Sequence, residues 1–288
     1  MSAAALTLPV PAKLPKAERY YTADTYLLPH DDIERARLQI QHEMLMKYTK
    51  ELLPSNLTLS DGDEVLDAGT GSGVWLMDVT RTVSPAVLFT GVDIEKRLFP
   101  QPLPNTKFLV QSTLSLPPHW SSKFTLVHQR LMVAAFSKDA WKQCISEFYR
   151  VLKPGGWLRL EEIDFLGVLE QEAIPPLTDR FWKGARVLCE ARGVSSDCLL
   201  RIPTLLEEVG FSDLQPIVTR IPYGSDENAR RVGIGAWKGM KVPFLKAGGF
   251  DVARTSEEYD AFIDQVEEEW ETSNFTRTYI TWIARKPL

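Results

Sequence analysis

Short apolar runs alternate with amphipathic stretches along most of the chain from residue 60 onward. The runs have the length of buried strands, whereas the stretches between them repeat their apolar positions every three or four residues, as helices do. This alternation is typical of an α/β fold in which helices cover both faces of a mostly parallel sheet. The strands predicted on this basis are Glu64–Asp67, Val87–Asp93, Lys107–Gln111, Phe124–His128 and Trp157–Ile163.

The clearest helical pattern lies at Asp139–Leu152, where the apolar residues repeat at spacings of three and four and the string LKPGG predicts the helix end. A second helix is predicted at Gly73–Val83. Residues 30–52 have their own helical period, with apolar residues on or near one side, so we expect a helix docked on the edge of the sheet.

The pattern changes after Ile163. Helices are predicted at 176–192 and 201–209, a sixth strand near 212–220, and a seventh strand at Thr276–Arg285. The last two strands are separated by a mostly helical segment that is too long for the usual connection of about two to six residues, so we expect an insert that covers a substrate. The prediction is a single domain, residues 1–288, with an N-terminal arm and cap helix at 1–55, a core sheet at 60–220 and 273–288, and the insert at 225–272.

The composition excludes several classes of protein. Hydrophobic residues make up 44% and charged residues 25% of the chain, which is typical of a globular protein and not of a disordered, collagen-like or coiled-coil chain. Lys and Arg number 33 against 38 for Asp and Glu, a net charge of −5, so no nucleic-acid partner is expected. No apolar run reaches the roughly 20 residues of a membrane-spanning helix, so no membrane partner is expected either.

The cysteines and histidines form no disulfide or metal pattern. The three cysteines are an odd number without CxxC spacing, and the four histidines form no HxxxH or HExxH pair. We therefore expect no metal and a reducing compartment. The N-terminal 21 residues lack the charged and apolar regions of a signal peptide, and we interpret them as a flexible arm of a cytosolic protein.

The stretch EVLDAGTGSGVW, from Glu64 to Trp75, carries the candidate chemistry. A strand ends in a carboxylate and passes through Gly69, Gly71 and Gly73 into a helix. Glycines there allow positive φ and bring backbone N–H groups close to a ligand, at the sheet edge where α/β proteins bind ligands. The helix N-terminus adds a partial positive charge. A glycine turn that only closes a β-α unit is the alternative interpretation.

Related glycine motifs do not match this stretch. The dinucleotide motif GxGxxG fails because Val74 stands at its third glycine position, and the nucleophile motif GxSxG fails because Thr70 stands at its first. The phosphate-loop string is absent as well. The remaining pattern is DxGxGxG, followed by an apolar strand that ends at Asp93.

That pattern resembles the class I S-adenosylmethionine-dependent methyltransferases, which have a Rossmann-like seven-stranded sheet. The strings YLLPHDDIERARLQIQH, DAGTGSGVW, RLFPQPLPNTKF, FTLVHQRLM and VLKPGGWLRLEE resemble the fungal branch that contains the secondary-metabolism regulator LaeA and many small-molecule methyltransferases. The resemblance spans about 26–163 and implies S-adenosylmethionine as cofactor, with S-adenosylhomocysteine as product. It further implies that Asp93 accepts hydrogen bonds from both ribose hydroxyls.

The resemblance implies a set of cofactor-binding residues: Tyr20, Gln41, Asp67, Gly69, Thr70, Gly71, Gly73, Trp75, Asp93, Ile94, Gln111, Ser112, Thr113, His128 and Arg130. In this branch the third strand usually ends in two acids, one of which accepts the adenine amino group. This chain has Gln111 and Ser112 there, whose neutral oxygens can accept the same hydrogen bond more weakly.

His128 and Glu162 are the candidate catalytic residues. His128 ends the fourth predicted strand, at a position where the family has a histidine. It is a candidate to form a wall of the site, to donate or accept a hydrogen bond, or to act as general base, and a purely structural role is the alternative. Glu162 and Asp164 share a face of the fifth strand and are candidates to orient an amine or accept its proton, the alternative being a solvated strand end. Arg130 is a candidate to bind an anion, with a salt bridge at the sheet rim as the alternative interpretation.

Two aromatic groups are candidates to cover the site. Tyr20, Tyr21 and Tyr26 precede the cap helix and are expected to fold over the cofactor, with anchoring to the surface as the alternative. Trp237, Met240, Phe244 and Phe250 in the insert are candidates for an apolar roof over the substrate, with an ordinary core as the alternative.

The predicted function is methylation of a small-molecule acceptor, of the kind found in fungal secondary metabolism, on O, N or C by in-line displacement. The alternatives are a LaeA-like cofactor-binding regulator and a cofactor-binding cyclase. The sequence identifies neither the acceptor nor the oligomeric state.

Overall fold

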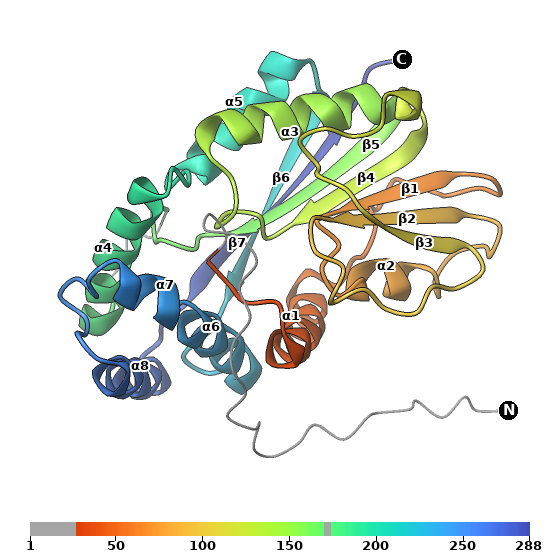
Figure 1. The fold of residues 1–288 in the computed structure, drawn as a ribbon. Coiled ribbons are helices and arrows are strands. Elements are labelled where there is room, and N and C mark those ends of the chain that lie inside the picture. Colours follow the sequence, from red (N-terminus) through yellow and green to blue (C-terminus); the bar gives the residue numbers. More distant parts are fainter. Residues whose placement is uncertain (1–26, 170–173) are drawn as a thin grey trace, which may run out of the picture.

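The computed structural model describes residues 27–169 and 174–288, and its centre is one seven-stranded sheet (Figure 1). The strand order is β3-β2-β1-β4-β5-β7-β6, and β7 runs antiparallel to both of its neighbours. The predicted mostly parallel seven-stranded sheet is therefore confirmed. The strands are β1 Glu64–Ala68, β2 Leu88–Asp93, β3 Thr106–Val110, β4 Phe124–Arg130, β5 Leu152–Ile163, β6 Ser212–Ile221 and β7 Arg277–Arg285.

Helices precede, link and cover these strands. They are α1 Asp32–Thr49, α2 Val74–Val79, the short 3-10 helix Pro118–Trp120, α3 Lys138–Val151, α4 Pro176–Ala191, α5 Cys198–Val209, α6 Glu227–Gly239, α7 Lys241–Lys246 and α8 Ser256–Glu271. In Figure 1, α3 and α5 lie on one side of the sheet, whereas α1 and α2 lie on the other.

Two predicted boundaries differ by more than three residues from the structure. The helix expected at Gly73–Val83 ends at Val79, after six residues. The helix before LKPGG ends at Val151, as that string predicts, but the strand expected to begin at Trp157 begins at Leu152, where it pairs with Phe124 of β4. Pairing with a neighbouring strand thus extends β5 over a Pro and two glycines that local sequence reads as a turn.

The core on the α3 side is built from the periodic apolar residues. Trp141, Cys144, Ile145, Phe148 and Val151 are all buried along α3, and the Ser137 side chain accepts the N–H of Ala140 at the helix start. A cap of this kind satisfies a backbone donor that the helix leaves free. The helix therefore has the single apolar face that the spacing predicts.

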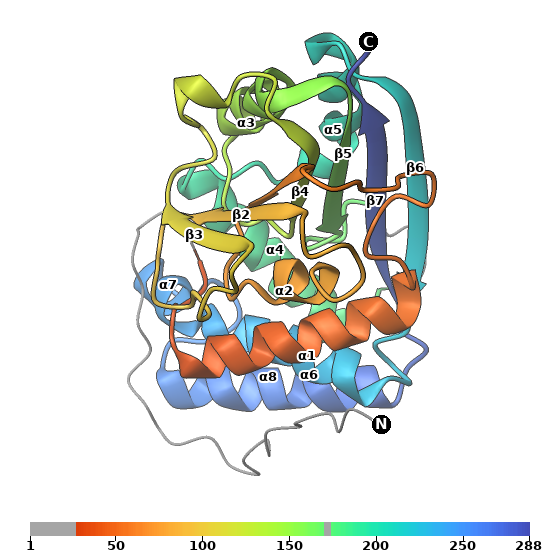
Figure 2. The same cartoon turned by 90° about the vertical axis from the view of Figure 1, so that its right-hand side faces the viewer.

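The insert between β6 and β7 consists of α6, α7 and α8, which gather with α4 beyond the carboxyl ends of the parallel strands (Figure 1). In Figure 2, α1 runs alongside α6. Lys47 and Tyr48 of α1 donate to Asp226, the residue that caps α6. The cap helix and the insert therefore form one wall over the same edge of the sheet.

None of the helices in the described ranges is long and apolar enough to cross a membrane.

Candidate active site

The glycine loop after β1 has the conformation that its sequence predicts. Gly69, Gly71 and Gly73 have φ angles of 71°, 53° and 70°, values that other residues rarely adopt. A Cβ atom on Gly69 would lie 2.9 Å from the sulfur of Met132. A larger residue there would have to push the Met132 side chain aside and also adopt a positive φ, so β1 and the β4–α3 loop approach each other closely.

Asp93, at the end of β2, holds this loop in place. Its Oδ2 accepts the N–H of Gly71 at 2.9 Å, and its Oδ1 accepts the N–H of Glu95 at 3.2 Å. Burial raises the pKa of Asp93, and the hydrogen bonds from Gly71 and Glu95 oppose that rise. The carboxylate is therefore a desolvated acceptor beside the loop, where a hydroxyl donor would bind strongly.

A cavity of about 460 Å³ opens beyond the glycine loop, within the usual range of about 300–1,000 Å³ for small-molecule sites. It extends from the ends of β1, β2 and β3, past the β4–α3 loop, to α6 and the start of β7. Ten of the predicted cofactor-binding residues line it: Gln41, Gly69, Thr70, Gly71, Asp93, Ile94, Gln111, Ser112, Thr113 and Arg130.

The remaining predicted residues lie elsewhere. Asp67, Gly73, Trp75, His128 and Glu162 are outside the cavity lining. Tyr20, Tyr21 and Tyr26 lie outside the residues that the structure describes.

The end of β3 offers an acceptor oxygen to the cavity. The Gln111 amide N–H donates to the backbone oxygen of Ser115 at 2.5 Å, so the donor half of this amide is engaged within the loop. The carbonyl half and the Ser112 hydroxyl are the groups with acceptor capacity at this place. This arrangement suits recognition of an amino group by neutral oxygens.

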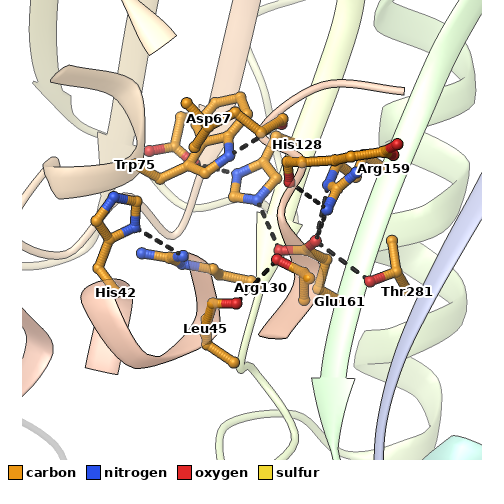
Figure 3. A network of polar contacts seen from close by, with 12 residues as sticks. His42, Leu45, Asp67, Trp75, His128, Arg130, Arg159, Glu161 and Thr281 are labelled. Atoms are coloured by element: carbon orange, nitrogen blue, oxygen red, sulfur yellow. Dashed lines mark hydrogen bonds and ion pairs between the residues drawn. The ribbon is translucent and has the colours of Figure 1, made fainter. Parts of the chain in front are cut away.

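His128 belongs to a buried polar network below the loop (Figure 3). Its Nδ1 lies 2.7 Å from the Asp67 carboxylate and its Nε2 lies 3.4 Å from Glu161, while the indole of Trp75 stacks on its ring at a centroid distance of 3.6 Å. Asp67 in turn accepts the hydroxyl of Thr70, which lines the cavity. His128 is fully buried, so it supports the loop through Asp67 and has no face toward the cavity.

Glu161 compensates the charges of this network. Although its burial opposes ionisation, the guanidinium of Arg159 and the nearby His128 hold the pKa of Glu161 well below its usual range. Tyr279 and Thr281 of β7 donate their hydroxyl groups to the same carboxylate. The network therefore connects the glycine loop on β1 with β7, across β4 and β5.

Arg130 is positioned by the cap helix. Its Nη1 donates to Nδ1 of His42 at 3.2 Å, and Nε2 of His42 lies 3.1 Å from Asp78 of α2. Burial and the charge of Arg130 lower the pKa of His42, so this ring is neutral and accepts from the arginine. Arg130 lines the cavity beside Gln41 and presents a fixed cation to it.

Glu162 shapes the loop between β4 and α3. Its carboxylate oxygens accept the N–H groups of Met132 at 2.8 Å and Val133 at 3.0 Å, and both of these residues line the cavity. Burial raises the pKa of Glu162 to about 8, against the two hydrogen bonds. Glu162 thus acts on the cavity through the loop that it holds.

The aromatic residues of the insert do not form the expected roof. Trp237 stacks on Phe181 of α4 at a centroid distance of 3.8 Å, and Phe244 stacks on the same ring at 5.1 Å. Trp237, Met240 and Phe244 are fully buried and lie outside the cavity lining. The insert contributes to the cavity through small and branched residues of α6 instead, namely Val232, Gly233 and Ala236.

The sequence did not identify a second group of polar residues in the cavity wall. Glu34 and Arg37 of α1, Tyr223 after β6 and Arg277 at the start of β7 all line the cavity and are buried. They come from three distant parts of the chain, so no single local motif contains all four. Glu34 and Arg37 lie within the string YLLPHDDIERARLQIQH, whereas nothing in the local sequence marks Tyr223 or Arg277.

Within the described ranges, no group of three or more His, Cys, Asp or Glu side chains is placed to hold a metal ion. Cys144, Cys189 and Cys198 are buried free thiols.

The chain is similar to known methyltransferases. A family described as "Methyltransferase domain" matches residues 65–156. The N-methyltransferase sirN of Leptosphaeria maculans is 30% identical, covering 91% of this chain and 95% of that protein. The N-methyltransferase gliN of Aspergillus fumigatus is 28% identical over 91% of this chain and 96% of that protein.

A solved structure shows the same fold. The Haemonchus contortus phosphoethanolamine N-methyltransferase 2, in complex with phosphomonomethylethanolamine and S-adenosylhomocysteine, superposes with a TM-score of 0.53 at 15% identity. The match covers 89% of this chain and 57% of that one. Together with the glycine loop and the near full-length relatives, this places the chain in the class I S-adenosylmethionine-dependent methyltransferase family, among the enzymes of fungal secondary metabolism.

Proposed function

We propose that this enzyme methylates a nitrogen atom of a small, largely apolar metabolite. The observation that carries the proposal is the continuous cavity, which joins the glycine loop to a wall of α6 that contains Val232, Gly233 and Ala236. Two relatives that align over almost their whole length are named N-methyltransferases. Nitrogen as the reacting atom therefore agrees with the names of these relatives, and the cavity has the size of a small-molecule site.

The residues around the glycine loop fit S-adenosylmethionine. The glycine loop would enclose the methionine end beside the N-terminus of α2, and Asp93 would accept the ribose hydroxyls. The carbonyl of Gln111 and the hydroxyl of Ser112 would accept the adenine amino group, in place of the usual acid. Bound there, the cofactor supplies a methyl group on an electrophilic sulfonium centre.

The protein's own contribution to the reaction is position and the exclusion of water. His128 and Glu162 have no access to the cavity, so we assign them to positioning: His128 fixes Asp67 and Thr70, and Glu162 fixes the β4–α3 loop. Holding two reactants in line contributes about 7–11 kcal/mol in favourable intramolecular reactions. An acceptor nitrogen that already carries a lone pair then needs no strong general base.

The proposal is tested in two steps with the full-length protein. Calorimetry with S-adenosylhomocysteine should show binding by the wild type, and incubation of S-adenosylmethionine with candidate amines and amides should give a product that is heavier by one CH2 unit. Binding without any methylated product would favour the regulator or the cyclase. Failure to bind the cofactor product would exclude all three.

We further propose that the enzyme works in the cytosol. The three free and buried cysteines agree with a reducing compartment. A fluorescent fusion in a fungal host would test this.

A further inference from the structure

The cavity has a second half that the glycine loop does not reach. In the sheet, β7 lies three strands away from β1, in the order β1-β4-β5-β7. At about 4.8 Å per strand, this separation is about 14 Å. The loop and Asp93 face the half over β1 and β2, so the start of β7 faces the half that remains for the acceptor.

A buried cation, Arg277, lies in that second half. The residue is 3% exposed and lines the cavity. Its Nη2 donates to the backbone oxygen of Asp164 at 2.6 Å, and its guanidinium lies 5.4 Å from the ring centroid of Tyr223 and 5.8 Å from that of Trp182. Its Nε is buried and has no hydrogen-bond partner.

Arg277 forms no direct ion pair with a carboxylate in the described part of the chain. The carboxylate of Asp164 is turned to its own loop, where it accepts the N–H groups of Val168 and Leu169. Arg37 is nearby, but it forms a bidentate pair with Glu34, at 2.9 and 2.6 Å. The Glu34–Arg37 pair is neutral as a unit, so one positive charge remains in this wall of the cavity.

A buried charge is costly unless it is paired or hydrogen-bonded. The aromatic faces and one backbone oxygen compensate part of the charge of Arg277, and its unpaired Nε–H is enclosed by the protein and does not face the cavity. Guanidinium groups bind sp2 oxygens with particular strength, because their N–H groups lie in one plane. A molecule that lies against this cation in the cavity is therefore expected to bring a carboxylate or carbonyl oxygen to it.

We infer that Arg277, packed against Tyr223, binds an sp2 oxygen of the methyl acceptor, so the acceptor is an apolar molecule that carries a carboxylate or a carbonyl group beside its nitrogen. Ile163, Phe165, Val232 and Ala236 line the same part of the cavity and surround the apolar body. This inference rests on the proposed function, because it assigns the second half of the cavity to the acceptor.

The test uses three probes of the same apolar body: phenylalanine, with a carboxylate; phenylalaninamide, with a neutral carbonyl; and phenethylamine, with neither. Binding of each is measured by calorimetry to the full-length protein saturated with S-adenosylhomocysteine. Loss of a hydrogen bond to a charged group costs about 1.5–3 kcal/mol. We therefore expect at least one oxygen-bearing probe to bind about tenfold or more tightly than phenethylamine, and the carboxylate and amide arms identify the oxygen.

Arg277→Gln should remove this preference while the affinity for S-adenosylhomocysteine stays within about twofold. Arg285→Gln is the matched control, because Arg285 lies at the other end of the same strand, where it donates to Gly155 and packs on Trp157. This control should keep the preference. Arg277→Lys keeps the charge but loses the planar donor group, so it should reduce the preference for the oxygen-bearing probes at least threefold. This variant decides the test if Arg277→Gln does not fold.

The outcomes separate the inference from the function on which it rests. A wild type that does not bind S-adenosylhomocysteine contradicts the proposed function. If the wild type binds S-adenosylhomocysteine but binds the three probes with equal affinity, or binds none of them, only the role of Arg277 is overturned. The same holds if Arg277→Gln, or in its place Arg277→Lys, keeps the full preference for the oxygen-bearing probes.

Discussion

The two halves of the cavity are built in different ways. The cofactor half is formed by β1, β2 and β3 and depends on backbone: a loop with three glycines at positive φ, held by the side chain of Asp93. The acceptor half is formed by α1, α6 and β7 and depends on side chains from residues 34 to 277, namely Glu34, Arg37, Tyr223 and Arg277. The positive φ angles of the glycine loop restrict which residues fit there, whereas the acceptor half changes with each side chain.

This difference explains where recognition from sequence succeeds. A site built from backbone requires glycine at fixed spacing, because Gly69, Gly71 and Gly73 all have positive φ, which other residues rarely adopt. A site built from side chains has no fixed residue spacing in the sequence, because each residue comes from a different helix or strand.

Trp237→Ala should destabilise the whole fold without touching the cofactor half. Its indole is fully buried and stacks on Phe181, so removing it leaves a large cavity in the core between α4, α6 and α8. We expect a loss of about 3–5 kcal/mol in the free energy of unfolding, measured by urea denaturation. Val242→Ala, at a half-exposed position of α7, is the control and should cost far less.

Asp93→Ala should weaken binding of S-adenosylhomocysteine by about 100-fold or more in calorimetry, because two hydrogen bonds to a charged acceptor are lost. The variant also frees the N–H of Gly71. Asp61→Ala, which removes an exposed carboxylate bound to Ser84, should leave the affinity unchanged. Equal affinities of wild type and Asp93→Ala would remove the ribose assignment.

Glu162 should make stability depend on pH. Burial raises its pKa from 4.5 to about 8 in the folded protein. Between these two values the folded state binds more protons than the unfolded state, so stability falls as the pH rises from about 4.5 to about 8. Below about 4.5 both states are protonated and this contribution is constant.

Glu162→Gln should flatten that dependence, since glutamine does not titrate and its oxygen still accepts one of the two loop N–H groups. The check is the Tm at several pH values, with Glu147→Gln as a comparison. Glu147 is half-buried and its pKa is lowered by Arg150, so its effect should have the opposite sign. An unchanged slope in Glu162→Gln would contradict the assignment.

Ala236→Leu should act on the acceptor half alone. Ala236 lies on α6 in the cavity wall, and a larger side chain there fills acceptor space. We expect the KM for a methyl acceptor to rise about tenfold, which corresponds to roughly 1.4 kcal/mol, with unchanged affinity for S-adenosylhomocysteine. A parallel rise in the Kd of the cofactor product would show that the two halves are not separable.

Most of the fold could be predicted from local sequence. Strands β1 to β5 and the insert follow from apolar periodicity, because each buries one face or both. The cap helix lies where it is predicted, but it buries Glu34, Arg37 and His42, so apolar periodicity does not give its buried side. Two boundaries could not be predicted. The helix α2 is shorter than its pattern, and β5 begins at Leu152 because pairing with Phe124 decides its start.

The site could be predicted in one half only. The glycines and Asp93 follow from one continuous motif, and the structure brings them together. The burial of His128 could not be predicted. Alternation along β4 shows on which face of the sheet its side chain lies, but the residues that cover it, Trp75 and the carboxylates of Asp67 and Glu161, come from other elements. Arg277 is adjacent to Tyr223 in space and 54 residues away in sequence.

The reversed direction of β7 has a consequence for how such enzymes diversify. Because β7 is antiparallel, it starts at the edge of the sheet where the parallel strands end and where the cavity lies. The insert therefore joins the acceptor half of the cavity directly, and β7 then runs to the opposite edge of the sheet. Residues 222–277 form a segment whose two ends join the sheet at β6 and β7. Exchange of this segment during evolution would change the acceptor half and leave the residues of the cofactor half in place. Grafting that segment between relatives is the corresponding route to altered substrate range in the laboratory.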